Sequence, residues 1–130
     1  MKVYVAAKFE EKDRVRLIYK RCRENGLEVT CDWTVEDDTG MVGEERRAYH
    51  QKCAQADLDG VRNCDVLILL PHEHGKGMYF EMGAAIALGK RVIVVGQDSD
   101  DSHKPCIFCK LPQVKWMPDI WGAIIEAANP

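Results

Sequence analysis

The sequence has 130 residues, of which 46% are hydrophobic and 30% charged, and its net charge is −3. This size and mixture predict one compact domain over residues 1–130, and the absence of a strong basic excess argues against duplex nucleic acid as a partner. No apolar run approaches the ~20 residues of a membrane helix, and the apolar run at the N-terminus is too short for a signal peptide. We therefore expect a cytoplasmic protein, without a membrane partner, whose six cysteines are mostly buried and reduced.

The first half of the chain alternates between strand and helix patterns. A short apolar run with β-branched residues opens it, and Val15, Ile18 and Cys22 then recur at helical spacing. Gly26 supplies the glycine that commonly follows a helix. The expected elements are a strand at 2–7, a helix at 10–25, a strand at 27–33, an acidic loop at 34–44 and a long helix at 44–63.

The second half contains two continuous apolar runs, DVLILL and RVIVVG. Such runs are typical of strands that are buried on both faces of a parallel sheet. A glycine-containing loop and an alanine-rich helix lie between them, and Pro118 fits the start of a closing helix. The expected elements are a strand at 65–70, a helix at 78–88, a strand at 91–96, a polar loop at 97–105, a strand at 113–117 and a helix at 119–128.

This alternation predicts an α/β fold with helices on both faces of a mainly parallel sheet. Five strands in the order 2-1-3-4-5 give a single-domain, three-layer, flavodoxin-like architecture. In such folds ligands bind beyond the carboxyl ends of the strands, where the strand order reverses. Here those ends are residues 6–9, 31–34 and 70–77.

Glu81 is the first candidate for chemistry. A glutamate in the first turn of a helix is commonly explained by its favourable interaction with the helix dipole, worth up to ~1 kcal/mol. Glu81, however, heads an apolar helix face and follows a strand end where ligands bind. We expect the helix N-terminus to lower its pKa, and an ionised carboxylate in a cleft can act as a nucleophile toward a sugar carbon.

Asp57 is the second candidate. It interrupts the i, i+4 row of Tyr49, Cys53, Asp57 and Val61, whose other members are apolar enough to face a core. A carboxylate in that position needs partners or a pocket. The alternative is that the row is rotated and that Asp57 is solvated.

Four further residues have both a functional and a structural interpretation. Gly75 and Gly77 leave room for a ligand at backbone N–H groups, although the GKG segment is a weak phosphate signature. The Tyr4 hydroxyl, if buried, needs a hydrogen-bond partner in the site; the alternative is that Tyr4 only packs in the core. Trp33 can stack on a base or pack beneath a lid.

A metal site has little support in the sequence. His103, Cys106 and Cys109 are close together, but no second C-x-x-C pair accompanies them. The C-x-x-C is also late in the chain, which argues against a thioredoxin-like role. We expect neither a metal nor another cofactor.

The segments DLDGVRNCDVLILL and GKGMYFEMGAAIALGKRVIVV together resemble the nucleoside 2-deoxyribosyltransferase superfamily, which includes 2′-deoxynucleoside 5′-monophosphate N-glycosidases. The resemblance runs from the tyrosine of the first strand to the fourth strand. It implies that Glu81 attacks C1′ of the sugar, that Asp57 positions the sugar or helps protonate the leaving base, and that Tyr4 orients Glu81. It also implies a homodimer or higher homo-oligomer with a small nucleoside or nucleotide as ligand.

The expected substrate contacts lie after the first three strands. They are Ala7, Lys8, Phe9, Asp32, Trp33, Gly75, Gly77 and Met78. Two positions depart from the resembled pattern. The family usually has Asp or Ser where this chain has Gly75, and a Gly-Ser pair where it has Ala7-Lys8; Lys8 can meet a 5′-phosphate as a point charge.

The sequence thus predicts cleavage or transfer at the N-glycosidic bond of a 2′-deoxynucleoside or its 5′-monophosphate, through a glycosyl-Glu81 intermediate. Two alternatives stay open. One is an NAD hydrolase of the Toll-receptor type, which shares a parallel sheet and a catalytic glutamate. The other is a nucleotide-binding module without activity, which Gly75 favours.

Overall fold

The computed structural model describes residues 1–98 and 106–130. Its strands are β1 (Lys2–Ala6), β2 (Glu28–Val29), β3 (Val66–Leu69), β4 (Arg91–Val95) and β5 (Val114–Met117). Its α-helices are α1 (Lys12–Glu24), α2 (Gly43–Asn63), α3 (Gly77–Ala87) and α4 (Ile120–Ala128). Three short 3-10 helices complete the described elements: η1 (Phe9–Glu11), η2 (Trp33–Val35) and η3 (Ile107–Lys110).

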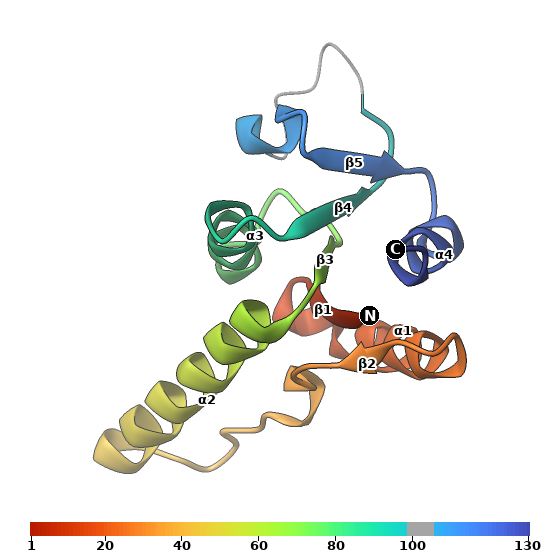
Figure 1. Ribbon diagram of the computed structural model, residues 1–130. Coiled ribbons are helices and arrows are strands. Elements are labelled where there is room, and N and C mark those ends of the chain that lie inside the picture. Colours follow the sequence, from red (N-terminus) through yellow and green to blue (C-terminus); the bar gives the residue numbers. More distant parts are fainter. Residues whose placement is uncertain (99–105) are drawn as a thin grey trace.

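The five strands form one parallel sheet in the order β2-β1-β3-β4-β5. Helices α1 and α4 pack on one face of the sheet, and α2 and α3 pack on the other (Figure 1). The predicted three-layer flavodoxin-like fold is therefore confirmed. The loop that we expected at residues 97–105 lies mostly outside the described residues.

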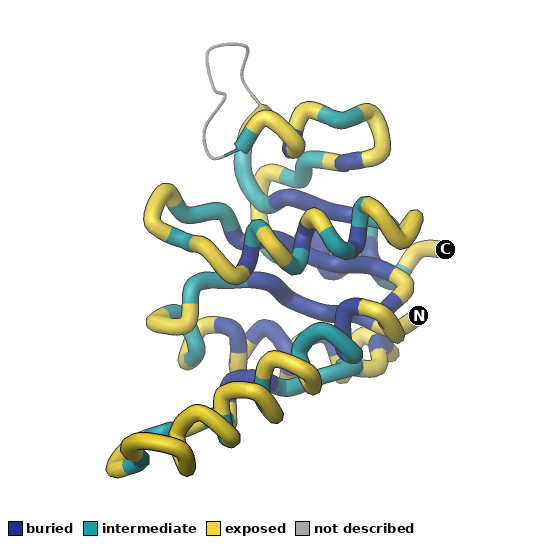
Figure 2. The backbone as a smooth tube through the Cα atoms, turned by 90° about the vertical axis from the view of Figure 1, so that its left-hand side faces the viewer, coloured by how far each residue is buried: buried dark blue, intermediate teal, exposed yellow. Residues whose placement is uncertain are grey.

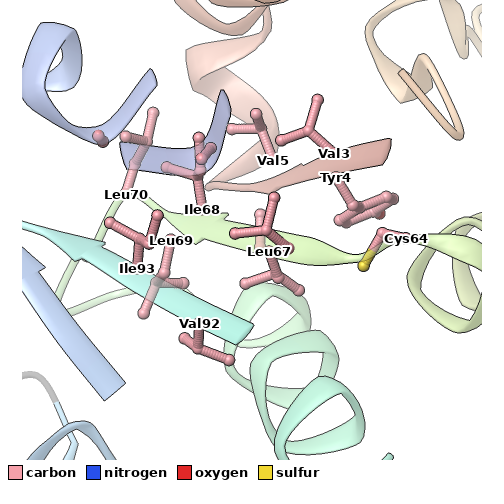
Figure 3. Close-up of a cluster of buried hydrophobic side chains, with 14 of the residues drawn as sticks. Val3, Tyr4, Val5, Cys64, Leu67, Ile68, Leu69, Leu70, Val92 and Ile93 are labelled. Carbon is pink, nitrogen blue, oxygen red and sulfur yellow. The ribbon is translucent and has the colours of Figure 1, made fainter. Parts of the chain in front are cut away.

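The apolar runs form the centre of the sheet because both of their faces are covered. All four residues of β3 are buried, as are the last four of β1 and the middle three of β4. Figure 3 shows Val3, Val5, Leu67 and Ile93 among the side chains that fill this core. A rigid sheet centre fixes the carboxyl ends of β1 and β3, where the candidate site lies.

The second strand is shorter than predicted. We expected it to reach residue 33, but β2 has only two residues. The Asp32 side chain accepts a hydrogen bond from the backbone N–H of Thr34 at 3.1 Å and caps η2. Such local bonds from aspartate compete with the extended backbone, so the chain leaves the sheet and turns toward α2.

Helix α2 packs on the body only through its last turns. Its buried residues are Gly60 and Val61, and most of its length stands away from the sheet (Figure 2). Tyr49 and Cys53, which are apolar enough to face a core, are only half-buried and do not face it. The Tyr49 hydroxyl instead accepts a hydrogen bond from the Asp37 N–H at 2.8 Å, so this row faces the segment after β2. Within residues 1–98 and 106–130, no helix combines the length and the apolar character needed to cross a bilayer.

Candidate active site

A cavity of about 320 Å³ opens at the carboxyl ends of β1 and β3. This is the size of a small-molecule site, and its place at the reversal of strand order is the one that the fold predicts. The lining residues come from β1 and η1, from the segment after β2, from α2, and from the β3–α3 loop with α3. They are Tyr4, Ala7, Lys8, Phe9, Glu10, Trp33, Glu36, Asp57, His74, Gly75, Lys76, Gly77, Met78 and Glu81.

Glu81 lies in this cavity in contact with Tyr4. The Tyr4 hydroxyl, on the buried strand β1, donates a hydrogen bond to Oε2 of Glu81. Burial beside the Glu81 carboxylate raises the pKa of Tyr4 well above its usual value, so the phenol keeps its proton and acts as a donor. The expected role of Tyr4 as a partner of Glu81 is consistent with this geometry.

The electrostatic expectation for Glu81 is corrected. Burial raises its pKa to about 7, the hydrogen bond from Tyr4 lowers it, and the Asp57 carboxylate raises it. Glu81 is the fifth residue of α3, beyond the first turn, where the effect of the helix dipole is already weaker. Desolvation therefore outweighs the dipole, and Glu81 titrates close to neutral pH.

Asp57 is neither solvated nor in an apolar core, because it faces the cavity. It accepts a hydrogen bond from Sγ of Cys31 at 3.6 Å and is hydrogen-bonded to the Glu36 carboxyl group. Burial raises the pKa of Asp57. Glu81, Asp57 and Glu36 thus bring three carboxyl groups from α3, α2 and the segment after β2 into one site.

Gly60 allows α2 to approach β1 closely enough to place Asp57. A Cβ at Gly60 would lie 2.6 Å from Cβ of Cys31 and 3.0 Å from the Tyr4 ring. The Gly60 carbonyl also accepts a hydrogen bond from the Thr30 hydroxyl at 2.7 Å. Asp57 precedes Gly60 by about one helical turn, so this contact sets its height above the sheet.

The glycines of the β3–α3 loop have different surroundings. The N–H of Gly75 donates to the carbonyl of His72 at 3.1 Å, so it is not presented to a ligand as we expected. A Cβ at Gly75 would lie 2.0 Å from the methyl carbon of Met78. The buried Met78 side chain therefore takes the space of a side chain at position 75. At Gly77, no atom beyond the adjacent residues and the helix's own backbone lies within 4 Å of the Cβ position, and Gly77 lines the cavity.

Lys8, His74 and Lys76 contribute basic side chains to the lining. Lys8 follows β1, and the other two precede α3, whose first two residues are Gly77 and Met78. The first amides of a helix have no acceptor within the helix and attract anions. The cavity therefore combines a carboxylate cluster with a set of anion-binding groups.

Two predicted substrate contacts have structural roles. The Asp32 carboxylate is committed to capping η2 and lies 3.8 Å from Arg23, and it does not line the cavity. Trp33 lines the cavity but is only 5% exposed, and its indole N–H donates to the Val5 carbonyl at 2.7 Å. The Trp33 ring also lies against Phe9, with ring centroids 6.3 Å apart. Its main role is to tie η2 to β1.

The described residues contain no group of three His, Cys, Asp or Glu side chains arranged to hold a metal ion. Cys106 and Cys109 are free thiols in this part of the chain. His103, the third residue of the motif considered above, lies outside the described residues.

A profile of the family described as nucleoside 2-deoxyribosyltransferase matches residues 3–128 of the chain. The chain belongs to this family. Membership supports an enzyme that acts on the glycosidic bond of a small nucleoside or nucleotide. A comparison with curated proteins found no match.

Several solved structures have the same fold as this family member. A CMP N-glycosidase from Clostridium botulinum is 20% identical with a TM-score of 0.63, and the match covers 97% of each chain. A 2-deoxyribosyltransferase from Bacillus psychrosaccharolyticus is 17% identical with a TM-score of 0.66, covering 100% of this chain and 92% of that one. A conserved protein from Enterococcus faecalis is 14% identical with a TM-score of 0.63, covering 98% and 96%.

Glu36 and Gly60 of this family member did not stand out in the sequence as site residues. Glu36 lies in an acidic segment that resembles an ordinary polar loop, and its nearness to Asp57 depends on the turn at η2. Gly60 offered a signal, because a glycine inside a predicted helix often marks a close approach of another segment.

Proposed function

We propose that the protein cleaves or transfers at the N-glycosidic bond of a 2′-deoxynucleoside or its 5′-monophosphate, with Glu81 as the nucleophile. The observation that carries this proposal is the Glu81 carboxylate in the cavity, oriented by the Tyr4 hydroxyl and facing Asp57. With a pKa of about 7, Glu81 is substantially ionised at neutral pH and is more basic than an ordinary carboxylate.

The proposed reaction has two displacement steps. An oxygen of Glu81 bonds to C1′ while the bond from C1′ to the base nitrogen breaks, and its electron pair leaves with the base, which takes up a proton. Water or a second base then attacks C1′ from the face that the first base left, and the Glu81 carboxylate is released. Two inversions at C1′ retain the configuration.

The basic groups of the cavity favour a 5′-monophosphate over a free nucleoside. Lys8, His74 and Lys76 line the site together with the start of α3, and a phosphate is the anion that such a set binds well. We propose that Gly77 and Met78 lie against this end of the substrate, and that Ala7 and Phe9 contact the sugar. A related solved structure is named a CMP N-glycosidase, which agrees with a nucleotide substrate.

A screen for released base tests the proposed function. The purified protein is incubated with 2′-deoxynucleosides, their 5′-monophosphates and NAD, each with and without an acceptor base, and products are separated by chromatography. We expect base release from a nucleoside 5′-monophosphate and a loss of more than about 1,000-fold for Glu81→Ala. Full activity of Glu81→Ala, or release of nicotinamide from NAD alone, would overturn the proposal.

The covalent step has its own measurement. A 2′-fluorinated substrate analogue slows both displacements because fluorine destabilises positive charge at C1′. We expect mass spectrometry to detect a glycosyl adduct on the peptide that contains Glu81. Turnover of this analogue with inversion at C1′ and no adduct would contradict a glycosyl-Glu81 intermediate.

We also propose that the protein acts as a homo-oligomer in the cytoplasm. Val42 and Phe80 are large apolar side chains, 76% and 70% exposed, on or beside the two helices α2 and α3. Most of α2 also stands away from the body (Figure 1). Sedimentation equilibrium should give a mass of at least two chains, and a monomer at assay concentration would exclude this assembly.

A further inference from the structure

Glu36 is a titratable group in the cavity that the mechanism above does not use. It directly follows η2 and lines the cavity together with Asp57 and Glu81. It also borders a second hollow of about 240 Å³, beside Phe9, Tyr49 and Cys53. Glu36 therefore borders both the cavity with the carboxylate cluster and the neighbouring hollow.

The backbone on both sides of Glu36 is fixed. Its own N–H donates to the Trp33 carbonyl at 3.1 Å, and the Trp33 indole is bonded to β1 at Val5. The next residue, Asp37, donates its N–H to the Tyr49 hydroxyl on α2 at 2.8 Å. Glu36 is thus held between β1 and α2 rather than carried on a freely moving lid.

Glu36 and Asp57 share one proton. A hydrogen bond between two carboxyl groups needs a proton on one of them, and this bond raises the pKa of Glu36 while it lowers the pKa of Asp57. Burial is the main cause that raises the pKa of Glu36 to about 8, and the hydrogen bond with Asp57 adds to this rise. The directions of these shifts favour Glu36 as the protonated member of the pair.

The groups that face Glu36 come from three directions. On α2 they are Asp57, Cys53 and Tyr49, on α3 there is Glu81, and in the segment after β2 there is Cys31. Asp37, Asp38 and His50 border the adjoining hollow. Burial is the largest cause of the raised pKa of Glu36. The charges of Asp57 and Glu81 raise this pKa further, whereas the hydrogen bond with Cys53 lowers it.

We propose that Glu36 is the general acid that protonates the departing base. This role rests on the proposed function. As the N-glycosidic bond breaks, its electron pair moves to the base, and the proton of Glu36 passes to a ring nitrogen or exocyclic oxygen of that base. The Glu36–Asp57 pair is left with two negative charges. In the second step Glu36 takes a proton from the attacking water or acceptor base.

The nucleophile and the acid are coupled through their charges. The Glu81 carboxylate raises the pKa of Glu36. When Glu81 forms the glycosyl ester, its negative charge disappears, so Glu36 becomes a stronger acid as the base needs its proton. Release of Glu81 in the second step restores the charge, and Glu36 becomes a better base for the attacking water. One cluster therefore serves both half-reactions.

The test compares leaving groups that need a proton with leaving groups that do not. One pair is 2′-deoxyguanosine 5′-monophosphate and its N7-methyl derivative, whose cationic base departs neutral. The other pair, of pyrimidine size, is 2′-deoxycytidine 5′-monophosphate and the nicotinamide 2′-deoxynucleotide. Glu36→Gln retains a donor toward Asp57 but has no acidic proton. We expect Glu36→Gln to slow release of the unmodified base by about 100- to 10,000-fold. Release of the cationic base should stay close to the wild-type rate.

The controls separate this role from its alternatives. Glu44→Gln makes the same change in the same acidic segment, at an exposed position of α2, and should match the wild type on all four substrates. If Glu36→Gln slowed both members of a pair equally, or slowed neither, the role of Glu36 as general acid would be overturned. The proposed function itself would stand. Failure of the wild-type protein to release any base would overturn the proposed function and this role with it.

A second measurement needs no variant. Glu81 must be ionised and Glu36 protonated, so the wild-type rate on an unmodified base should rise through about pH 7 and fall through about pH 8. With the cationic base the fall at high pH should be absent. An identical alkaline fall for both members of a pair would overturn the proposal.

Discussion

Tyr4 and Glu81 are 77 positions apart in the sequence and meet through a hydrogen bond in the cavity. The bond matters because Glu81 is subject to two opposing effects: burial favours its neutral form, and the phenol stabilises its charged form. A hydrogen bond to a charged group in a partly buried site contributes more than one in water. Tyr4 therefore offsets part of the rise in the Glu81 pKa that burial causes.

Tyr4→Phe should move the acid limb of activity to higher pH. Without the hydroxyl, the pKa of Glu81 rises above about 7, so less of the protein carries the ionised nucleophile at neutral pH, and the rate recovers as the pH increases. The measurement is the pH–rate profile with the N7-methyl substrate, which should lack an alkaline limb.

Tyr79→Phe is the matched control for Tyr4→Phe. The Tyr79 hydroxyl bonds to the backbone of His72 instead of a carboxylate, so its loss should leave the position of the acid limb unchanged. An acid limb that stays in place in Tyr4→Phe would show that the hydroxyl does not set the pKa of Glu81.

At the scale of elements, the site depends on how α2 meets β1. Only the last turns of α2 are buried, and Gly60 is the point where the helix backbone approaches Cys31 and Tyr4. The exposed remainder of α2 contributes little to the core, yet its inward row holds the segment after β2 through Tyr49, Cys53 and Asp57. The helix therefore organises the acidic side of the cavity.

Gly60→Ala should destabilise the protein and reduce its activity. The new Cβ would lie 2.6 Å from a Cβ that cannot easily move, and such overpacking typically costs about 1–3 kcal/mol. Displacement of α2 also moves Asp57. Urea denaturation gives the change in the free energy of unfolding, and base release gives the change in activity.

Gly83→Ala provides the contrast within a helix. Gly83 lies in α3, and no atom beyond the adjacent residues and the helix's own backbone lies within 4 Å of its Cβ position. Alanine should therefore raise the free energy of unfolding by about 0.5–1 kcal/mol through its better helix propensity. A Gly60→Ala protein as stable as Gly83→Ala would contradict the close approach of α2.

At the scale of the whole molecule, the buried carboxylate cluster affects the stability of the fold, because burial disfavours charged groups. The raised pKa of Glu81 means that the folded protein binds a proton more tightly than the unfolded chain, whose glutamates titrate near pH 4.5. Between about pH 4.5 and 7 the contribution of Glu81 to the free energy of unfolding therefore falls as the pH rises. This contribution is smallest at the pH where the nucleophile is ionised.

Glu81→Gln should stabilise the protein at pH 8 by about 3 kcal/mol and by little at pH 4, where the wild-type carboxyl group is already neutral. Glutamine can still accept the hydrogen bond from Tyr4. Urea denaturation at the two pH values measures the difference, with Glu44→Gln as the control expected to show none. An equal gain at both pH values, or a loss at pH 8, would contradict a buried, high-pKa Glu81.

Apolar patterning predicted the fold, because short apolar runs rich in β-branched residues are typical of strands covered on both faces, and their alternation with helices leaves few arrangements. It also located the site, since the carboxyl ends of parallel strands meet at one edge. The roles expected for Tyr4, Asp57 and Glu81 came from the family resemblance, because patterning alone left a structural alternative for each of them. Contacts between distant segments decided the rest. The Asp32 turn brings Glu36 to Asp57, and Met78 fills the space at Gly75. Desolvation of Glu81 reverses the pKa shift that its helix position predicted, because burial is a property of the folded chain and not of any local sequence.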